Sequence, residues 1–124
     1  MLIYFCSPFA GPDQIRNVTW ARDSCRKIAL AGATPFAPHL FFPLFLDDTK
    51  PEQRARGIAA GLEIMHATAD EVWFYLPPWR STMSNGMVQE HKAAWDAELT
   101  VVIITSHDEW EDNLARLRAL LAAP

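Results

Sequence analysis

The sequence predicts an α/β fold: a parallel sheet of four to five strands with helices on both faces, in a three-layer sandwich. Four short apolar or β-branched runs alternate along the chain with segments whose apolar residues recur at helical spacing. The links between these segments are short, and crossovers between parallel strands are right-handed. No repeat or low-complexity segment interrupts the pattern.

The first strand is predicted at residues 2–6, a continuous apolar run that Ser7 and Pro8 end. Such runs are typical of strands that are covered on both faces. A helical face follows and closes at Gly32. Strand, turn and helix in this order open a βαβ unit.

The second strand, residues 34–37, is short and contains Pro35, which suits a position at or near an edge. Residues 40–46 are unusually apolar for a connection. Two explanations remain open: a loop folded over the core, or an exposed patch that another subunit covers.

A third unit follows. Thr49 and Glu52 have the spacing of a capping box and predict a helix that runs to about Ala69. The apolar run 72–76 predicts the third strand, and Ser84 is a good N-cap for the next helix.

The chain closes with a β-branched run at residues 100–105 and a helical face formed by Trp110, Leu114, Leu117 and Leu121. The complete order, βαβαβαβα, favours a flavodoxin-like sheet with strand order 2-1-3-4. In such a sheet ligands bind at the carboxyl ends of the strands, beside the first strand.

Composition excludes several function classes. The 124 residues suffice for one domain, 1–124, and the charge of −4 without a basic block argues against a nucleic-acid polymer as partner. Cys6 and Cys25 lack metal-ligand spacing, so we expect reduced packing cysteines, no metal and no cofactor. The short apolar start resembles neither a signal peptide nor a membrane span, which favours a cytoplasmic protein without a membrane partner.

The predicted topology gathers residues 7–9, His39 and residues 84–90 at one crevice. Glu90 then lies about one and a half turns into a helix, near the positive end of its dipole, where an ionised glutamate could act as a nucleophile. On these residues alone, a solvated surface acid is the alternative.

Three segments, in order along the chain, resemble a known superfamily. They are Ile3–Phe9, then 37–40 with 45–48, and Ser84–Glu90. With them the chain is similar to the nucleoside 2-deoxyribosyltransferases and nucleotide N-glycosidases, and within that superfamily to a branch of small proteins.

The resemblance implies that Glu90 attacks the anomeric carbon of a nucleoside or nucleotide, releasing the base and leaving a glycosyl ester that water or a second base resolves. Relatives that use free nucleosides carry an aspartate six residues before the nucleophile, where this chain has Ser84. Serine there resembles the branch that hydrolyses nucleoside 5′-monophosphates, and a hydroxyl beside helix-start amides suits a phosphate. The family's further binding acid has no certain match, since Glu63 is expected to be solvated.

We expect Phe9 to stack on the base. His39 could protonate the leaving base or only brace its loop, and Arg80 could bind the phosphate or remain solvated. The role of Arg16 and Asn17 stays open in the same way. The predicted substrate-binding residues are Ser7, Pro8, Phe9, His39, Arg80, Ser84, Asn85, Gly86 and Met87.

Two other functions remain possible from the sequence. One is a non-catalytic nucleotide sensor, because fold does not fix function; the other is an NAD-cleaving module, against which the Ser-Pro-Phe start argues. The apolar residues 40–46, together with relatives that complete their pockets across subunits, predict a homodimer or higher homo-oligomer.

Overall fold

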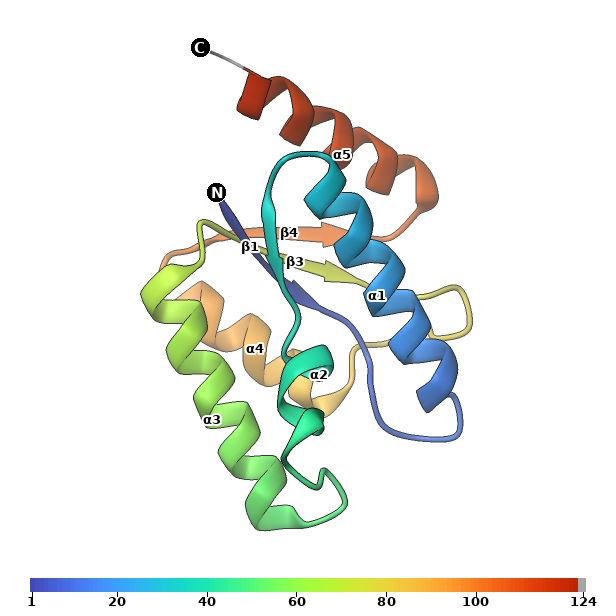
Figure 1. Cartoon of the computed structure of the whole chain (residues 1–124), viewed down its shortest axis with the longest axis vertical. Coiled ribbons are helices and arrows are strands. Elements are labelled where there is room, and N and C mark those ends of the chain that lie inside the picture. The colour runs from blue at the N-terminus through green and yellow to red at the C-terminus, as the bar shows by residue number, and fades with distance from the viewer. Residues whose placement is uncertain (123–124) are drawn as a thin grey trace.

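The computed structural model describes residues 1–122 and shows one four-stranded, all-parallel sheet in the order β2-β1-β3-β4, with helices on both faces (Figure 1). The predicted fold class and strand order are therefore confirmed. The strands are β1 (Leu2–Cys6), β2 (Thr34–Phe36), β3 (Glu71–Tyr75) and β4 (Thr100–Ile104). The helices are α1 (Gln14–Leu30), α2 (Pro38–Phe41), the 3-10 turn η1 (Phe42–Leu44), α3 (Pro51–Thr68), α4 (Asn85–Asp96) and α5 (His107–Ala122).

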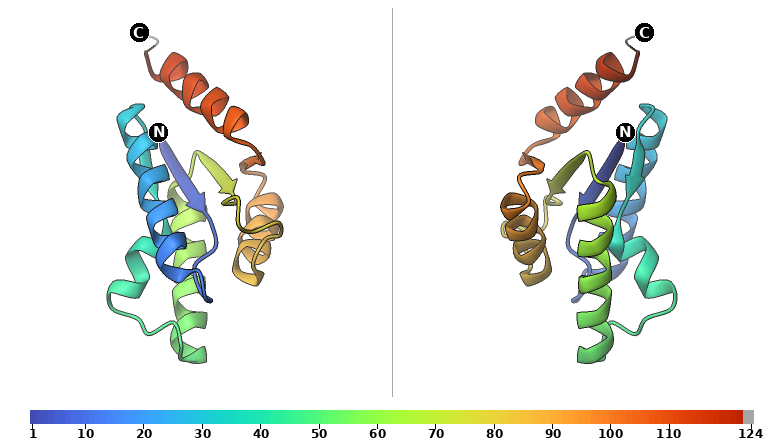
Figure 2. Two further views of the ribbon diagram at one scale, coloured as in Figure 1. Left: turned by 90° about the vertical axis from the view of Figure 1, so that its right-hand side faces the viewer. Right: turned by 90° about the vertical axis from the view of Figure 1, so that its left-hand side faces the viewer.

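The sheet separates two apolar cores. Helices α1 and α5 pack on one face, against Ile3 and Phe5 of β1, while α3 and α4 pack on the other, against Tyr4 and Cys6 (Figures 1 and 2). This division follows from the strand geometry, because successive side chains of a strand point to opposite faces. Every second residue of β1 therefore faces α4.

The parallel register brings the carboxyl ends of the two central strands to one edge of the sheet. Cys6 at the end of β1 pairs with Phe74 near the end of β3. The segments that leave these strands, residues 7–13 and 76–84, consequently begin side by side, as the switch point of this topology requires.

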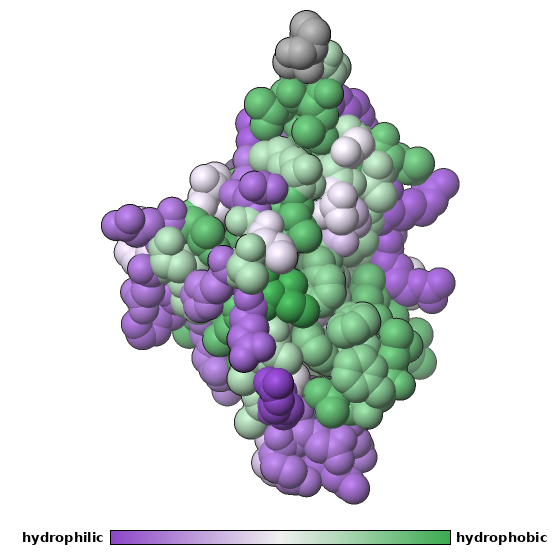
Figure 3. Space-filling model, turned by 60° about the vertical axis from the view of Figure 1, so that its left-hand side comes forward, coloured by the Kyte–Doolittle hydropathy of each residue, from purple (hydrophilic) through white to green (hydrophobic). Residues whose placement is uncertain are grey.

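Residues 40–46 form the end of α2, the turn η1 and the following loop. Phe42 is only 9% exposed and packs against Phe36, whereas Phe41, Leu44 and Phe45 are 43%, 78% and 61% exposed. The first explanation, a loop folded over the core, therefore holds for Phe42, while the other three side chains leave an exposed apolar surface. We call Phe41, Leu44 and Phe45 the apolar patch; Figure 3 shows a broad hydrophobic area on the side of the molecule that carries α2.

The predicted capping box at Thr49 is wrong. Helix α3 begins at Pro51 with Lys50 as its N-cap, and no side chain caps it. The Thr49 hydroxyl instead donates to Asp47 Oδ1 at 2.6 Å, and the Thr49 amide donates to the same oxygen at 3.0 Å. This local turn competes with capping and moves the helix start by one residue, so that Glu52 no longer stands at the third helical position.

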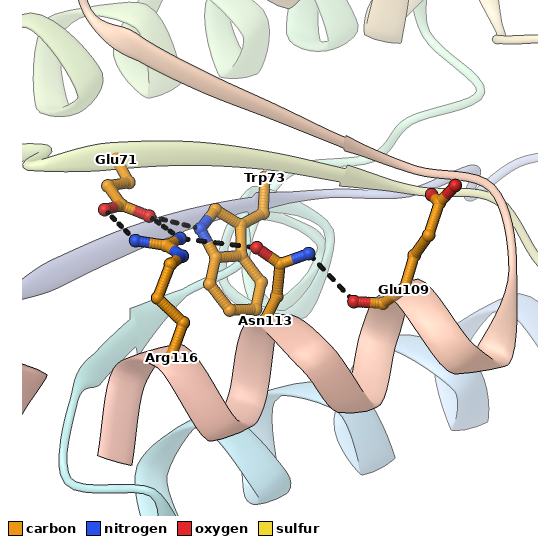
Figure 4. Close-up of polar contacts among 5 residues, drawn as sticks. All are labelled: Glu71, Trp73, Glu109, Asn113 and Arg116. Carbon is orange, nitrogen blue, oxygen red and sulfur yellow. Dashed lines mark hydrogen bonds and ion pairs between the residues drawn. The ribbon is translucent and has the colours of Figure 1, made fainter. Parts of the chain in front are cut away.

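The opposite edge of the sheet, where β3 begins, holds a buried carboxylate. Glu71 accepts two hydrogen bonds from Arg116 of α5, at 2.6 and 2.9 Å, and a third from the indole of Trp73 at 2.9 Å (Figure 4). Arg116 and Trp73 hold the pKa of Glu71 below its usual range, against the effect of burial. This network fastens α5 to the sheet.

None of the helices described in residues 1–122 is both long and apolar enough to cross a membrane.

Candidate functional site

Helix α4 begins where the sequence places it, immediately after Ser84. The Ser84 backbone is extended and its hydroxyl oxygen accepts a hydrogen bond from the Met87 amide at 3.2 Å, which is the N-cap geometry. Glu90 follows in the second turn and is 5% exposed. The structure therefore excludes the alternative of a solvated surface acid.

The Glu90 carboxylate points toward β1. The Cys6 thiol donates to its Oε2 at 3.3 Å, whereas Oε1 is buried and has no hydrogen-bond partner among residues 1–122. Burial raises the pKa of Glu90 to about 7, although the nearby Cys6 thiol and Tyr4 hydroxyl oppose the shift. Buried polar atoms are nearly always paired, so an unpaired carboxylate oxygen points to a functional site.

A cavity of about 260 Å³ adjoins Glu90. Its walls come from Tyr4 of β1 and the loop after β1, from α2 and η1, from the first half of α3 and the loop before it, and from the start of α4 and the loop before it. Among the residues predicted from sequence, those that line it are Phe9, His39, Arg80, Ser84, Asn85, Gly86 and Glu90. Ser7, Pro8 and Met87 are buried and lie outside this lining.

Phe9 and His39 form one wall of the cavity as a stacked pair, with ring centroids 5.1 Å apart and planes 19° from parallel. Burial, with a further contribution from the charge of Arg54, lowers the pKa of His39 to about 4. With this pKa the imidazole is neutral at neutral pH. It therefore lacks the additional proton that a donor to the leaving base would transfer. The face of Phe9 that packs on His39 is likewise not free for a base.

The two loops that flank the cavity are tied together by Asn17, which is 3% exposed. Its amide donates to the Phe9 carbonyl at 3.1 Å, and its carbonyl oxygen accepts from the Trp79 indole at 2.9 Å. The Arg16 guanidinium lies over the Trp79 ring, 4.0 Å from its centroid. Arg16 and Asn17, left open by the sequence, therefore hold the walls of the cavity.

Two arginines give the cavity a positive wall. Arg80 lines it next to the start of α4, and its Nε donates to the Thr82 carbonyl at 2.7 Å, which orients the side chain. Arg54 lines it from α3. Together with the free amides at the first turn of α4, these cations suit an anionic ligand.

Sequence reasoning missed Tyr4, Cys6 and Arg54. Tyr4 and Cys6 occupy alternate positions of β1 and share the face that α4 covers. The period-two alternation of strand side chains contained this information, once the helix carrying Glu90 was assigned to that face. Arg54 offered no such signal, because surface arginines are common in helices. Within residues 1–122, no group of three or more His, Cys, Asp or Glu side chains is placed to hold a metal ion.

Comparisons with known proteins agree with this fold. A family model described as Domain of unknown function (DUF7768) matches residues 1–104. No curated protein matches the chain. Among solved structures, the 2-deoxyribosyltransferase of the psychrotolerant bacterium Bacillus psychrosaccharolyticus matches with a TM-score of 0.64 and 20% identity, over 94% of this chain and 96% of that one. At this identity the match establishes a shared fold.

Proposed function

We propose that this chain, which belongs to the family described as Domain of unknown function (DUF7768), cleaves the N-glycosidic bond of a ribo- or deoxyribonucleoside 5′-monophosphate, with Glu90 as nucleophile. The base leaves by hydrolysis or by transfer to a second base. The fold shared with a 2-deoxyribosyltransferase supports this class of reaction.

One observation carries most of the proposal: Glu90 is buried beside a cavity while its Oε1 has no partner among the described residues. A carboxylate desolvated in this way is destabilised by burial unless a partner compensates. A sugar carbon that develops positive charge in an oxocarbenium-like transition state provides that compensation.

The reaction has two steps. In the first, a lone pair of Glu90 forms an ester bond to the anomeric carbon while the bond from that carbon to the base nitrogen breaks; its electrons leave with the base, which takes up a proton. In the second, water or a second base attacks the same carbon, loses a proton, and releases the carboxylate. With water, the products are a free base and a 5-phosphosugar.

The start of α4 is the proposed site of the 5′-phosphate. The amides of Asn85 and Gly86, in its first turn, have no partner within the helix, whereas the Met87 amide donates to the Ser84 hydroxyl. Arg80 and Arg54 line the same cavity. The Ser84 hydroxyl can donate a hydrogen bond to a nearby phosphate oxygen, whereas an aspartate there would repel the phosphate.

The test is to incubate the protein with a panel of ribo- and deoxyribonucleoside 5′-monophosphates, the matching nucleosides, and NAD, and to follow free base by chromatography. We expect base release from monophosphates, and its loss in the Glu90→Gln variant. Tight binding of nucleotides without any release would favour the sensor function instead. Release of nicotinamide alone would favour NAD cleavage.

We also propose that a second copy of the chain covers the apolar patch. The segment that exposes Phe41, Leu44 and Phe45 also lines the cavity through Phe42, Pro43 and Leu46, so an assembly through this face would border the site. Light scattering at micromolar concentration should show a dimer or larger species. Phe45→Glu should shift it toward monomer, and a wild-type monomer would contradict the proposal.

A further inference from the structure

Cys6 reaches the site through a hydrogen bond from its thiol to Glu90. Its thiol lies 3.3 Å from Glu90 Oε2, its exposure is 0%, and it does not line the cavity. A substrate in the cavity therefore does not touch Cys6. The hydrogen bond to the carboxylate is the contact by which this thiol can influence a reaction.

We propose that Cys6 is a positioning residue: its thiol holds Oε2 of Glu90 against β1, so that Oε1 is the oxygen that attacks the anomeric carbon. The role as stated rests on the proposed function of Glu90 as nucleophile. The two carboxylate oxygens differ in the required way, because Oε2 accepts the thiol hydrogen bond while Oε1 is unpartnered within the described residues.

The choice of a thiol has a chemical consequence. A thiol is a weak donor, whereas a hydroxyl forms a stronger hydrogen bond to a carboxylate and stabilises its charge more. Cys6 therefore fixes the orientation of Glu90 and leaves the carboxylate more nucleophilic than a hydroxyl at the same position would. Burial and the neighbouring Glu90 raise the pKa of Cys6 well above its usual range, so it stays a protonated donor throughout the pH range of an assay.

Other ionisable groups face Glu90 and remain unchanged when Cys6 is replaced. Tyr4 of β1 lies close to the same carboxylate. The cavity is also lined by four other ionisable side chains: His39 of α2, Asp48 of the loop before α3, Arg54 of α3 and Arg80 of the loop before α4. A change in Glu90 titration on replacing Cys6 thus reports the thiol itself.

The first experiment measures the titration of Glu90 directly, by NMR of protein labelled with ¹³C at the glutamate carboxyl carbons. Glu90→Gln identifies its resonance. In Cys6→Ser the midpoint should move to lower pH, because the hydroxyl is a stronger donor; in Cys6→Ala it should move to higher pH, because the donor is lost. Cys25→Ser, at the partly buried cysteine of α1, is the matched control and should leave the midpoint unchanged. Equal or same-direction shifts in the two Cys6 variants would overturn the proposal.

The second experiment observes the thiol. Cys25→Ser leaves Cys6 as the only thiol of the chain, so its S–H stretching band in the infrared can be assigned. The band should move to lower frequency as Glu90 ionises, and should not respond to pH when Glu90→Gln is added. A band insensitive to pH in Cys25→Ser would show that Cys6 does not donate to Glu90.

The third experiment separates this proposal from the proposed function. Base release in Cys6→Ala should lose about tenfold to a hundredfold in kcat, as expected for a misplaced nucleophile, with KM changed little because Cys6 does not touch the substrate. Thermal unfolding of both variants verifies that they are folded. If the two Cys6 variants shift the Glu90 midpoint in opposite directions but the wild type releases no base, the proposed function is rejected and the role of Cys6 in holding Glu90 is retained. If the wild type releases base but the midpoint does not shift, the proposed function is retained and the role of Cys6 is rejected.

Discussion

Glu71 and Glu90 are both almost fully buried, with 6% and 5% of their surfaces exposed, but they lie at opposite edges of the sheet in opposite surroundings. Glu71 receives three hydrogen bonds from Arg116 and Trp73, and its pKa is lowered. In Glu90, one oxygen accepts a hydrogen bond from the Cys6 thiol, the other has no partner among residues 1–122, and the pKa is raised. The comparison shows what a buried carboxylate looks like in this chain when its role is structural.

The fold thus gives Glu71 a charged donor, Arg116, whereas the donor that it gives Glu90 is the neutral thiol of Cys6. A carboxylate that stabilises is surrounded by charged and polar donors, whereas a carboxylate proposed to react is desolvated and keeps an oxygen free. Four predictions test this contrast, beginning with the largest effect.

Glu90→Gln should reduce base release by about a thousandfold or more, because the amide keeps the shape but lacks the attacking oxygen and its charge opposite the oxocarbenium ion. Glu71→Gln should leave the rate of the folded protein close to that of the wild type. The measurement is free base by chromatography, with nucleotide binding by calorimetry as the control for the integrity of the cavity. Near-normal release from Glu90→Gln would exclude it as the nucleophile.

The two acids should give opposite pH dependences of stability. The pKa of Glu90 is about 7 in the folded state against 4.5 for an exposed glutamate. As pH rises, Glu90 therefore loses its proton in the unfolded chain first. Its contribution to the free energy of unfolding is fully present below pH 4.5 and is lost by about pH 7. The difference between the two pKa values corresponds to about 3 kcal/mol. Glu71, with a lowered folded pKa, contributes stability above its unfolded pKa and loses it as pH falls through the folded value.

Urea unfolding at about pH 5 and about pH 8 measures this effect. Glu90→Gln should remove the decline in the free energy of unfolding between the two values, and Glu71→Gln should retain it. A decline that persists in Glu90→Gln would assign it to another group.

Arg116→Ala should lower the free energy of unfolding by about 2 kcal/mol, because Glu71 stays buried with only the Trp73 indole as donor. The value is moderate since the Arg116 side chain is 43% exposed. Thermal or urea unfolding measures the loss, and Arg118→Ala on the same helix is the control. The titration of Glu90 should be unchanged, because the two carboxylates lie at opposite edges of the sheet.

Ser84→Asp should weaken binding of nucleoside monophosphates about tenfold or more while affecting nucleosides much less, because a carboxylate repels the phosphate. Aspartate is itself a good N-cap, so α4 should still begin at residue 85. Ser84→Asn, of similar shape but neutral, is the matched control, and calorimetry gives the affinities. Equal losses for nucleotides and nucleosides would place the phosphate elsewhere.

Local sequence patterns predict the order of strands and helices, the N-cap at Ser84 and the position of Glu90 in the second turn of α4. These features depend on periodicity, proline and capping, which act over a few residues. The same local reasoning failed at Thr49, where Asp47 offered a competing turn that spacing alone does not rank.

The pKa shifts of the ionisable groups, in contrast, arise from contacts between distant parts of the chain. Cys6 and Glu90 are 84 residues apart in the chain and Glu71 and Arg116 are 45 apart, so no local pattern relates them. His39 has an ordinary sequence context, yet burial beside Phe9 and the charge of Arg54 make it neutral. A pKa depends on desolvation and on charges a few ångströms away, and only the folded chain sets these distances.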